Sequence, residues 1–256
     1  MIKYFILSYR GAKELETNFD VSKFNQTKIY IVDNGQQNFT KHKSHLYYST
    51  SRNIGCAGGW NLICKIAFEH LHCHQIIIGQ DDTILEQEHL LKITEKTNEN
   101  TICGLFSPFF EFSCFGINRE TWKKIGHFDE NCIDAYCEDA DYKQRCYLSG
   151  IAVINLGLPG KKYNLRISIN KNPRLQDTLY VNRSYVRSKW GKSLNKTEIG
   201  RLEEQPPYLY KYPFNKIENK INFIPLTHRL KKVHNVKDIF PSSDEFKIFQ
   251  RLQKAI

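Results

Sequence analysis

Three groups of acidic residues in this 256-residue chain have the types and spacing that could do chemistry. The first is "QDD", where Asp81 and Asp82 follow Gln80 at the end of the apolar run "QIIIG". Two adjacent carboxylates repel each other unless a cation or hydrogen-bond donors compensate them. Oxygen ligands suit Mg²⁺ or Mn²⁺, which also accept diphosphate oxygens. This stretch therefore predicts a site for a divalent cation with a diphosphate, and the simpler alternative is a solvated loop.

The second group is "VDNG", in which Asp33 and Asn34 follow the apolar run "IYIV". An aspartate in this position is often a turn or cap residue, because its side chain bonds to nearby backbone amides. A carboxylate at the carboxyl end of a strand can instead accept hydrogen bonds from a nucleotide base or ribose. Both interpretations stay open for Asp33.

The third group is "CEDADYKQR", which carries Glu138, Asp139 and Asp141 ahead of Arg145. If this stretch is a helix, Glu138 and Asp139 lie in its first turn, where the helix dipole favours negative charge by about 0.3–1 kcal/mol each. Asp141 and Arg145 are four residues apart and can pair. Asp139 is then free to point into a cleft, and the alternative is a well-capped surface helix.

A glycine-rich segment, "SRNIGCAGGWN", spans residues 51–61. Its glycines would let the backbone approach a ligand, and the helix expected after it would offer amides to a phosphate. The spacing matches neither the dinucleotide fingerprint nor the P-loop. The alternative is a tight turn that packs a helix on a strand.

These groups follow elements that alternate along the chain. Apolar runs predict strands at 3–9, 28–35, 45–50, 75–82 and 148–157, and helical spacing predicts helices at 11–18, 60–72, 86–97 and 174–191. This alternation predicts an α/β fold with a mostly parallel sheet covered by helices on both faces. Ligands in such folds bind at the carboxyl ends of the strands, where Asp33 and the "QDD" stretch would both lie.

Charge divides the chain into two parts. Residues 1–160 carry 16 Lys and Arg against 19 Asp and Glu, whereas residues 161–256 carry 21 against 8. We expect a core over 1–160 and a basic, helical extension over 161–256 that packs on it and faces an acceptor or an anionic membrane. A nucleic-acid partner is not expected, because basic residues interleaved with strand aromatics are absent.

The eight cysteines contain no C-x-x-C pair, which favours reduced, buried side chains over a metal knuckle or disulfides. No apolar run reaches the roughly 18 residues of a membrane span. The first residues, "MIKYFILSYR", lack the pattern of a secretory signal and predict a buried strand. We therefore expect a cytoplasmic protein with peripheral attachment at the inner face of the membrane.

Five motifs follow one another in the order of a known family. Over residues 3–157 the chain resembles the inverting, family-2-like glycosyltransferases of the nucleotide-diphospho-sugar (GT-A) fold. "IVDNG" is similar to its nucleotide-recognition motif, "NIGCAGGWN" to its N-x-G-x-A-G-G-x-N segment, and "QDD" to its D-x-D. "FGINRETWKKIGHFDE" followed by "YCEDADYKQR" is similar to the acceptor-side segment and the catalytic Glu-Asp pair. "YVRSKWG" with "YPFN" resembles a tail of bacterial members that build surface polysaccharides, including rhamnosyl transferases.

The resemblance implies an enzyme that transfers a hexosyl or deoxyhexosyl group from a UDP- or dTDP-sugar to a hydroxyl of a glycan or lipid-linked acceptor. It implies Asp139, beside Glu138, as the general base, and Asp82 as a ligand of Mg²⁺ or Mn²⁺ at the diphosphate. The implied donor-binding residues are Asp33, Asn34, Arg52, Asn53, Gly58, Asn61, Gln80 and Asp81.

The chain departs from the family pattern at two positions. Gln80 replaces the first aspartate of the D-x-D, and no histidine occurs in "LGLPGKKYN", where the family often has a metal ligand. We therefore expect weak metal binding, with Lys161 or Lys162 as another source of positive charge. The alternative function is a catalytically inactive module that binds a nucleotide sugar or glycan on the same fold.

Overall fold

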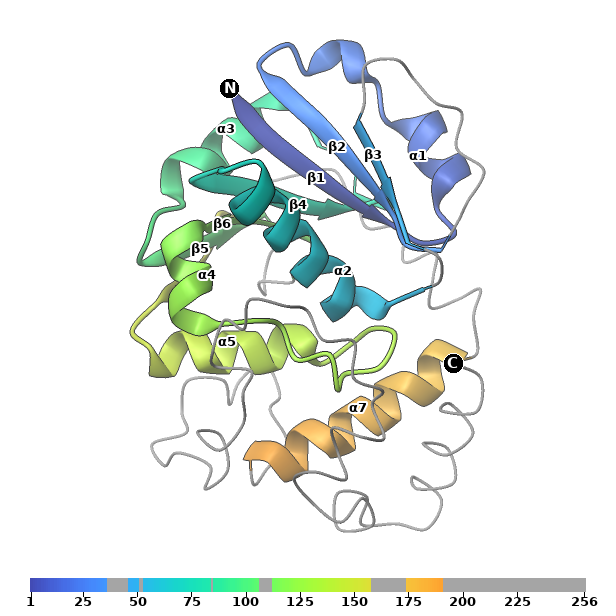
Figure 1. The fold of residues 1–256 in the computed structure, drawn as a ribbon, viewed down its shortest axis with the longest axis vertical. Coiled ribbons are helices and arrows are strands. Elements are labelled where there is room, and N and C mark those ends of the chain that lie inside the picture. Colours follow the sequence, from blue (N-terminus) through green and yellow to red (C-terminus); the bar gives the residue numbers. More distant parts are fainter. Residues whose placement is uncertain (36–45, 51–52, 84, 106–111, 158–173, 191–256) are drawn as a thin grey trace.

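The structure, a computed structural model, describes residues 1–35, 46–50, 53–83, 85–105, 112–157 and 174–190 (Figure 1). Its centre is a seven-stranded sheet in the order β3-β2-β1-β4-β6-β5-β7. The strands are β1 (Ile2–Ser8), β2 (Thr27–Asp33), β3 (Leu46–Ser49), β4 (Gln75–Gln80), β5 (Thr101–Gly104), β6 (Cys114–Asn118) and β7 (Ala152–Asn155).

The sheet is mostly parallel. Strands β3, β2, β1 and β4 pair in parallel, as do β5 and β7, whereas β6 runs antiparallel to both of its neighbours. The chain builds outward from β1 through β2 to β3 and then returns to the other side of β1 with β4. The strand order therefore reverses between β1 and β4, which is where an open α/β sheet usually leaves a crevice for a ligand.

Helices cover both faces of the sheet. On one face lie α2 (Gly55–Lys65), its π-helical continuation (Ile66–His70), α4 (Arg119–Ile125) and α5 (Glu138–Leu148); on the other lie α1 (Ala12–Asn18) and α3 (Gln87–Lys96). Figure 1 shows α2 lying across the face of the sheet. A short 3₁₀ turn (Val21–Lys23) precedes β2.

The central strands are apolar on both sides because both sides are covered. In β1, Phe5 and Leu7 join the core under α2, while Tyr4 and Ile6 join the core under α1 and α3. Such continuous apolar runs are typical of parallel strands buried on two faces. The predicted fold class, a mostly parallel central sheet with helices on both faces, is confirmed.

Several boundaries differ from those predicted. Helix α2 begins at Gly55 rather than at residue 60, so the glycines of the 51–61 segment lie inside the helix rather than ahead of it. Strands β5 and β6 and helix α4 were not predicted. The predicted strand at 148–157 is shortened to β7, because α5 continues to Leu148.

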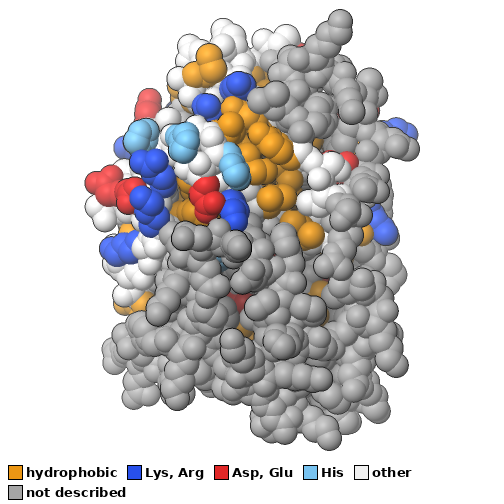
Figure 2. Space-filling model, in the orientation of Figure 1, with side chains coloured by type: hydrophobic (Ala, Val, Ile, Leu, Met, Phe, Trp, Pro, Cys, Tyr) orange, Lys and Arg blue, Asp and Glu red, His pale blue; other side chains and the backbone are white. Residues whose placement is uncertain are grey.

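The predicted helix at 174–191 is present as α7 (Arg174–Trp190). The predicted boundary at 160, the "YPFN" stretch, Arg52, Lys161 and Lys162 lie outside the described residues. Figure 2 shows acidic and basic side chains interspersed on one face of the described part, next to a group of hydrophobic ones. Within the described ranges, no helix has the length and hydrophobicity that crossing a bilayer requires.

Candidate active site

Three neighbouring strands end in polar residues at one edge of the sheet. Asp33 closes β2 in register with Ser8 of β1, and Gln80 closes β4 in register with Leu7 of β1. Because β2, β1 and β4 run in parallel, these side chains meet at the carboxyl edge, beside the reversal of strand order. The sequence-based expectation that Asp33 and the "QDD" stretch share this edge is confirmed.

The two adjacent aspartates after β4 have different surroundings. The Oδ2 atom of Asp81 accepts hydrogen bonds from Ser8 Oγ at 2.6 Å and from the Tyr9 amide at 2.8 Å. These bonds tie the end of β4 to the end of β1. Asp81 therefore helps to build the edge, and its role in donor binding stays a prediction.

Asp82 is 9% exposed, and its Oδ1 atom has no hydrogen-bond partner among the described residues. Burial raises the pKa of Asp82 to about 6, because the charged form loses its hydration. A buried carboxylate oxygen without a partner is costly for the protein alone. Such an oxygen is a natural ligand for a cation or a donor group that a substrate brings.

Asn34 holds the segment that leads into α2. Its Oδ1 accepts the Ile54 amide at 2.8 Å, and its Nδ2 donates to Asn53 Oδ1 at 2.9 Å and to the Gly55 carbonyl at 3.1 Å. The amide of Asn34 is thus engaged within the protein. Asp33 beside it is 5% exposed, and Ser49 Oγ lies 3.5 Å from its Oδ2.

The first two amides of α2 are not available to a phosphate, so the anion site expected at the glycine-rich segment lacks two of its donors and otherwise stays a prediction. The Gly55 amide donates to Asn53 Oδ1 at 2.9 Å, and the Cys56 amide donates to the Asp134 carbonyl. Gly55 has a φ of +78°, and a Cβ there would lie 3.1 Å from the Asp134 carbonyl oxygen. The first two amides of α2 are therefore engaged within the protein.

The remaining residues of this segment pack α2 against its surroundings. A Cβ at Gly59 would lie 2.5 Å from Leu7 Cδ1 on β1, so the helix approaches the strand closely only because of this glycine. Gly58 is less constrained, since a Cβ there would make an ordinary contact of 3.4 Å with Ile54, the residue just before α2. The Gly59 contact agrees with the alternative interpretation, a segment that packs a helix on a strand.

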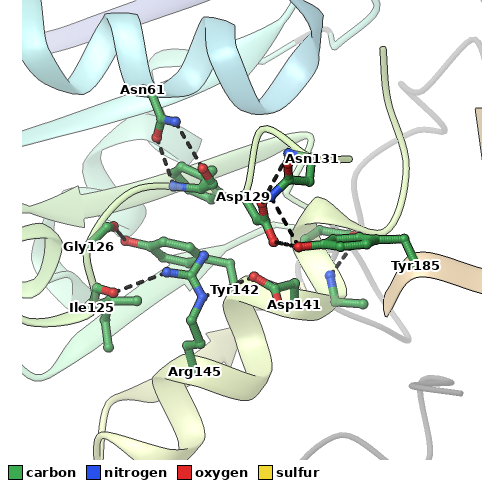
Figure 3. A network of polar contacts seen from close by, with 12 residues as sticks. Asn61, Ile125, Gly126, Asp129, Asn131, Asp141, Tyr142, Arg145 and Tyr185 are labelled. Atoms are coloured by element: carbon green, nitrogen blue, oxygen red, sulfur yellow. Dashed lines mark hydrogen bonds and ion pairs between the residues drawn. The ribbon is translucent and has the colours of Figure 1, made fainter. Parts of the chain in front are cut away.

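The side-chain amide of Asn61 forms hydrogen bonds with the loop that precedes α5 through both its oxygen and its nitrogen. It accepts the Phe128 amide at 2.8 Å and donates to the Phe128 carbonyl at 3.0 Å and to Glu130 Oε1 at 2.8 Å. Figure 3 shows Asn61 reaching from α2 into this loop. Asn61 can therefore affect a bound donor through the loop, and direct donor binding by Asn61 stays a prediction.

Helix α5 begins with the predicted Glu138–Asp139 pair. Glu138 is 4% exposed, and its Oε2 has no hydrogen-bond partner among the described residues. Burial raises the pKa of Glu138 well above that of an ordinary glutamate, and the neighbouring charge of Asp139 raises it further. Asp139 is partly exposed, and its Oδ1 accepts the Ala140 amide at 2.7 Å. The first turn therefore pairs a buried acid that favours its neutral form with a carboxylate closer to solvent.

The predicted pairing of Asp141 with Arg145 is confirmed. Arg145 Nε donates to Asp141 Oδ2 at 3.0 Å, and both side chains are buried. Arg145 also donates to the Ile125 carbonyl at 3.1 Å, and Tyr142 donates to the Gly126 carbonyl at 3.1 Å (Figure 3). These bonds fix α5 to the end of α4. Asp141 therefore has a structural role, and Asp139 does not take part in these bonds.

Cys56 lies beside Gln80 and senses the charges of both groups of acids, and no motif in the sequence predicts this. Gln80 Nε2 lies 3.6 Å from the Cys56 sulfur. Burial raises the pKa of the Cys56 thiol strongly, and the charges of Glu138, Asp139 and Asp82 raise it further. These acids, from two distant parts of the chain, are thus within electrostatic range of one sulfur atom.

A divalent metal fits this site only if the protein supplies few of its ligands. Among the described residues, no group of three or more His, Cys, Asp and Glu is arranged to hold a metal ion. Asp82 does offer a buried oxygen without a partner. Mg²⁺ is often held by one or two carboxylates and completes its shell with water and phosphate oxygens. The donor set therefore suits a metal that arrives with a diphosphate and is anchored by Asp82.

No protein-family model matches the chain, and no curated protein sequence matches it. Among solved structures, 43 chains match. One is described as the crystal structure of GalNAc-T7 with UDP, GalNAc and Mn²⁺; the match has 9% sequence identity and a TM-score of 0.43, and covers 78% of this chain and 54% of that chain. The present chain thus spans about half the length of that chain. A likeness of this size identifies no activity.

Proposed function

We propose that this protein is an inverting glycosyltransferase of the GT-A type that moves a sugar from a nucleoside-diphosphate sugar to a hydroxyl of a glycan or lipid-linked glycan. The observation that carries the proposal is the carboxyl edge of the sheet, where Asp33 and Gln80 close neighbouring parallel strands and the buried Oδ1 of Asp82 has no partner among the described residues. The order of the strands reverses between β1 and β4 at this edge, which is where a nucleotide is expected in such a sheet. The order of five sequence motifs supports the same function.

The donor would lie along the edge formed by β2, β1 and β4. Asp33, nearly buried at the end of β2, would accept hydrogen bonds from the base. Gln80 and Asp82, at the end of β4, would face the diphosphate. Asn34 and Asn61 would support the donor by holding the segments around it, because their amides are engaged within the protein. Arg52, outside the described residues, is assigned to the ribose or diphosphate from the resemblance alone.

Asp82 would be the protein ligand of a bound Mg²⁺ or Mn²⁺, with the diphosphate supplying further oxygens. Such a cation would offset the negative charge of the departing diphosphate. Because Gln80 supplies no charge at the position of the first carboxylate, the affinity for the metal should be low in the absence of the donor.

Asp139 would act as the general base. The acceptor oxygen attacks the anomeric carbon, the bond from that carbon to the phosphate oxygen breaks, and the nucleoside diphosphate leaves with the electron pair. Asp139 takes the proton of the acceptor hydroxyl, and a single displacement inverts the anomeric configuration. A carboxylate with a pKa near 4 is a weak base towards a free alcohol, but it suffices when the proton moves late, after bond formation has acidified the hydroxyl.

Glu138 would support this base without competing with it. Its raised pKa favours the neutral form near pH 7, so it adds little negative charge beside Asp139. A second ionised carboxylate at this place would attract the proton that Asp139 must accept and release. Glu138 would therefore keep the charge of the pair on Asp139.

The proposal is tested by incubating the protein with UDP-, GDP- and dTDP-sugars, with and without Mn²⁺, and measuring thermal shift and released nucleoside diphosphate. We expect at least one UDP- or dTDP-sugar to raise the melting temperature and to be turned over. Full activity in excess chelator would instead assign charge neutralisation to protein cations such as Lys161 or Lys162. The absence of both binding and turnover for all donors would contradict the proposal.

The second candidate is an inactive module that binds a nucleotide sugar or glycan. It is favoured by Gln80, which removes one carboxylate from the diphosphate end of the site. This module would show the thermal shift without any release of nucleoside diphosphate. The same assay therefore separates the two functions.

The basic excess of residues 161–256 supports a lipid-linked acceptor at an anionic membrane surface. Co-sedimentation with vesicles that contain phosphatidylglycerol, compared with neutral vesicles, tests this part of the proposal. Equal binding to both kinds of vesicle, or binding to neither, would contradict it.

A further inference from the structure

The loop that carries the catalytic pair into α5 has an unusual backbone. Asp134, Tyr136 and Cys137 all have positive φ values, of 52°, 79° and 71°. Residues other than glycine rarely adopt this left-handed conformation, and they persist there only when their surroundings enforce it. Glu138 follows Cys137 directly, so whatever enforces this conformation also determines where Glu138 and Asp139 lie.

Asn182 of α7 bonds to this loop with its entire side chain. It is fully buried; its Oδ1 accepts the Ile133 amide at 2.9 Å. Its Nδ2 donates to the carbonyls of Ile133 at 2.8 Å, Ala135 at 2.9 Å and Tyr136 at 3.0 Å. An asparagine amide has only two N–H groups, so one of them is shared between carbonyls. Asn182 therefore pairs backbone groups that no helix or strand satisfies.

Tyr185, three residues further along the same helix, holds the beginning of the loop. Its hydroxyl donates to Asp129 Oδ2 at 2.7 Å and accepts from Asn131 Nδ2 at 3.2 Å (Figure 3). Residues three apart lie on one face of a helix, so α7 presents Asn182 and Tyr185 to the loop together. Burial raises the pKa of Tyr185, and the charge of Asp129 raises it further, which keeps the hydroxyl a donor.

The loop also touches the donor side of the site. The Asp134 carbonyl accepts the Cys56 amide, and Gly55 packs against the Asp134 backbone. At the other end, the Cys137 carbonyl accepts the Asp141 amide at 3.0 Å in the first turn of α5. A shift of this loop would therefore change the position of Glu138 and Asp139 relative to Cys56 and Gln80.

We infer that Asn182 and Tyr185 form a clamp on residues 129–137 and are positioning residues for the Glu138–Asp139 pair. This inference rests on the proposed function for the role of that pair. The clamp acts through the loop, since the bonds of Asn182 and Tyr185 go to loop atoms and not to the acids themselves. Its loss should displace the general base while leaving the nucleotide end of the site in place.

The test compares Asn182→Asp and Tyr185→Phe with Tyr180→Ala and the wild type. Asn182→Asp keeps the size of the side chain but turns a donor that faces three carbonyls into an acceptor. Tyr185→Phe is milder, because it removes only the hydroxyl. Tyr180 lies on the same helix and is 50% exposed, so its variant controls for changes in α7 itself.

Two readouts are measured on the full chain: amide hydrogen exchange by peptide, and kcat with the KM of the donor. We expect exchange in peptides covering 129–141 to rise roughly tenfold in Asn182→Asp and by a smaller factor in Tyr185→Phe, while peptides from β1 and β4 stay unchanged. We expect kcat to fall roughly tenfold to a hundredfold with an unchanged donor KM, because the base is misplaced and the donor is not. Tyr180→Ala should match the wild type in both readouts.

Unchanged exchange in 129–141, or a uniform rise over the whole chain, would overturn the clamp. A rise confined to 129–141 with kcat unchanged would overturn the positioning role. If the wild-type protein turns over no donor, the proposed function fails, and the exchange pattern of Tyr185→Phe alone upholds or overturns the clamp.

Discussion

The two sides of the site are held in place by different means. On the donor side, Asp33 and Gln80 stand at the ends of parallel strands, and the hydrogen-bond ladder of the sheet sets their positions. On the base side, Glu138 and Asp139 follow a loop with left-handed residues, which side chains of α2 and α7 hold by hydrogen bonds. The backbone thus fixes one half of the site, and buried side chains fix the other.

This difference predicts where the protein is vulnerable to substitution. The stability of the sheet is distributed over many backbone hydrogen bonds. Single side-chain changes at the donor edge should therefore have local effects. The base side depends on a few buried polar groups, and removing one partner leaves the other unpaired. The change in the free energy of unfolding should therefore differ in size and in sign between substitutions on the two sides.

The largest expected effect is that of Arg145→Met on the base side. The change leaves the buried Asp141 carboxylate and the Ile125 carbonyl without this partner, and we expect a loss of about 3–5 kcal/mol in the free energy of unfolding. Urea denaturation measures it. Lys92→Met, which breaks the exposed pair with Glu88, is the control and should change stability by less than about 0.5 kcal/mol. Equal effects of the two variants would show that the buried pair does not hold the base side.

A smaller effect, of opposite sign, is expected for Asp82→Asn at the donor edge. The pKa of Asp82 is raised to about 6, so the folded state holds a proton that the unfolded state has released between about pH 4 and pH 6. The wild type therefore loses stability as the pH rises through this window. We expect Asp82→Asn to be more stable by about 3 kcal/mol above pH 6 and equal to the wild type below pH 4.

The matched control is Asp81→Asn, which removes the charged acceptor for Ser8 and Tyr9 and should lower stability by about 1–2 kcal/mol. Thermal unfolding from pH 3.5 to 8 measures both variants. If Asp82→Asn destabilises the protein at pH 7, Asp82 has partners in the folded chain and is not the open ligand inferred here.

The smallest expected effect is that of Cys137→Gly in the left-handed part of the base-side loop. Glycine removes a backbone strain of roughly 1 kcal/mol but costs about 0.5–1 kcal/mol in chain entropy, so the net gain should stay below about 1 kcal/mol. Ala140→Gly, inside α5, is the control and should lose about 1 kcal/mol. Calorimetric melting temperatures compare the two. Equal losses would show that the conformation of Cys137 is not strained.

The same comparison explains what could be predicted from the sequence. The strands that carry the donor edge, β1 to β4, were predicted within two residues of their ends, because buried parallel strands are continuous apolar runs followed by polar residues. Strands β5 and β6 were not predicted: β5 has only four residues, and the antiparallel direction of β6 leaves no mark in its composition.

On the base side, the pairing of Asp141 with Arg145 was predictable because it is local in one helix. The bonds of Asn182 and Tyr185 to the loop span 46 to 56 residues of sequence, and no spacing rule connects such partners. The sequence favours a small apolar role for Cys56, because its contact with Gln80 joins residues 24 positions apart and exists only in the folded chain. Contacts between distant segments determine the structure of the base side, and such contacts cannot be predicted from patterns along the chain.

The most direct measurement of the central claim is donor turnover by Asp139→Asn, with donor binding measured by calorimetry on the same sample. If Asp139 is the general base, turnover falls by at least about a hundredfold. The dissociation constant of the donor stays within about twofold of the wild-type value, because the donor is held by the opposite side of the site. Near-normal turnover in Asp139→Asn would contradict the assignment of the base and, with it, the division of the site into a donor side and a base side.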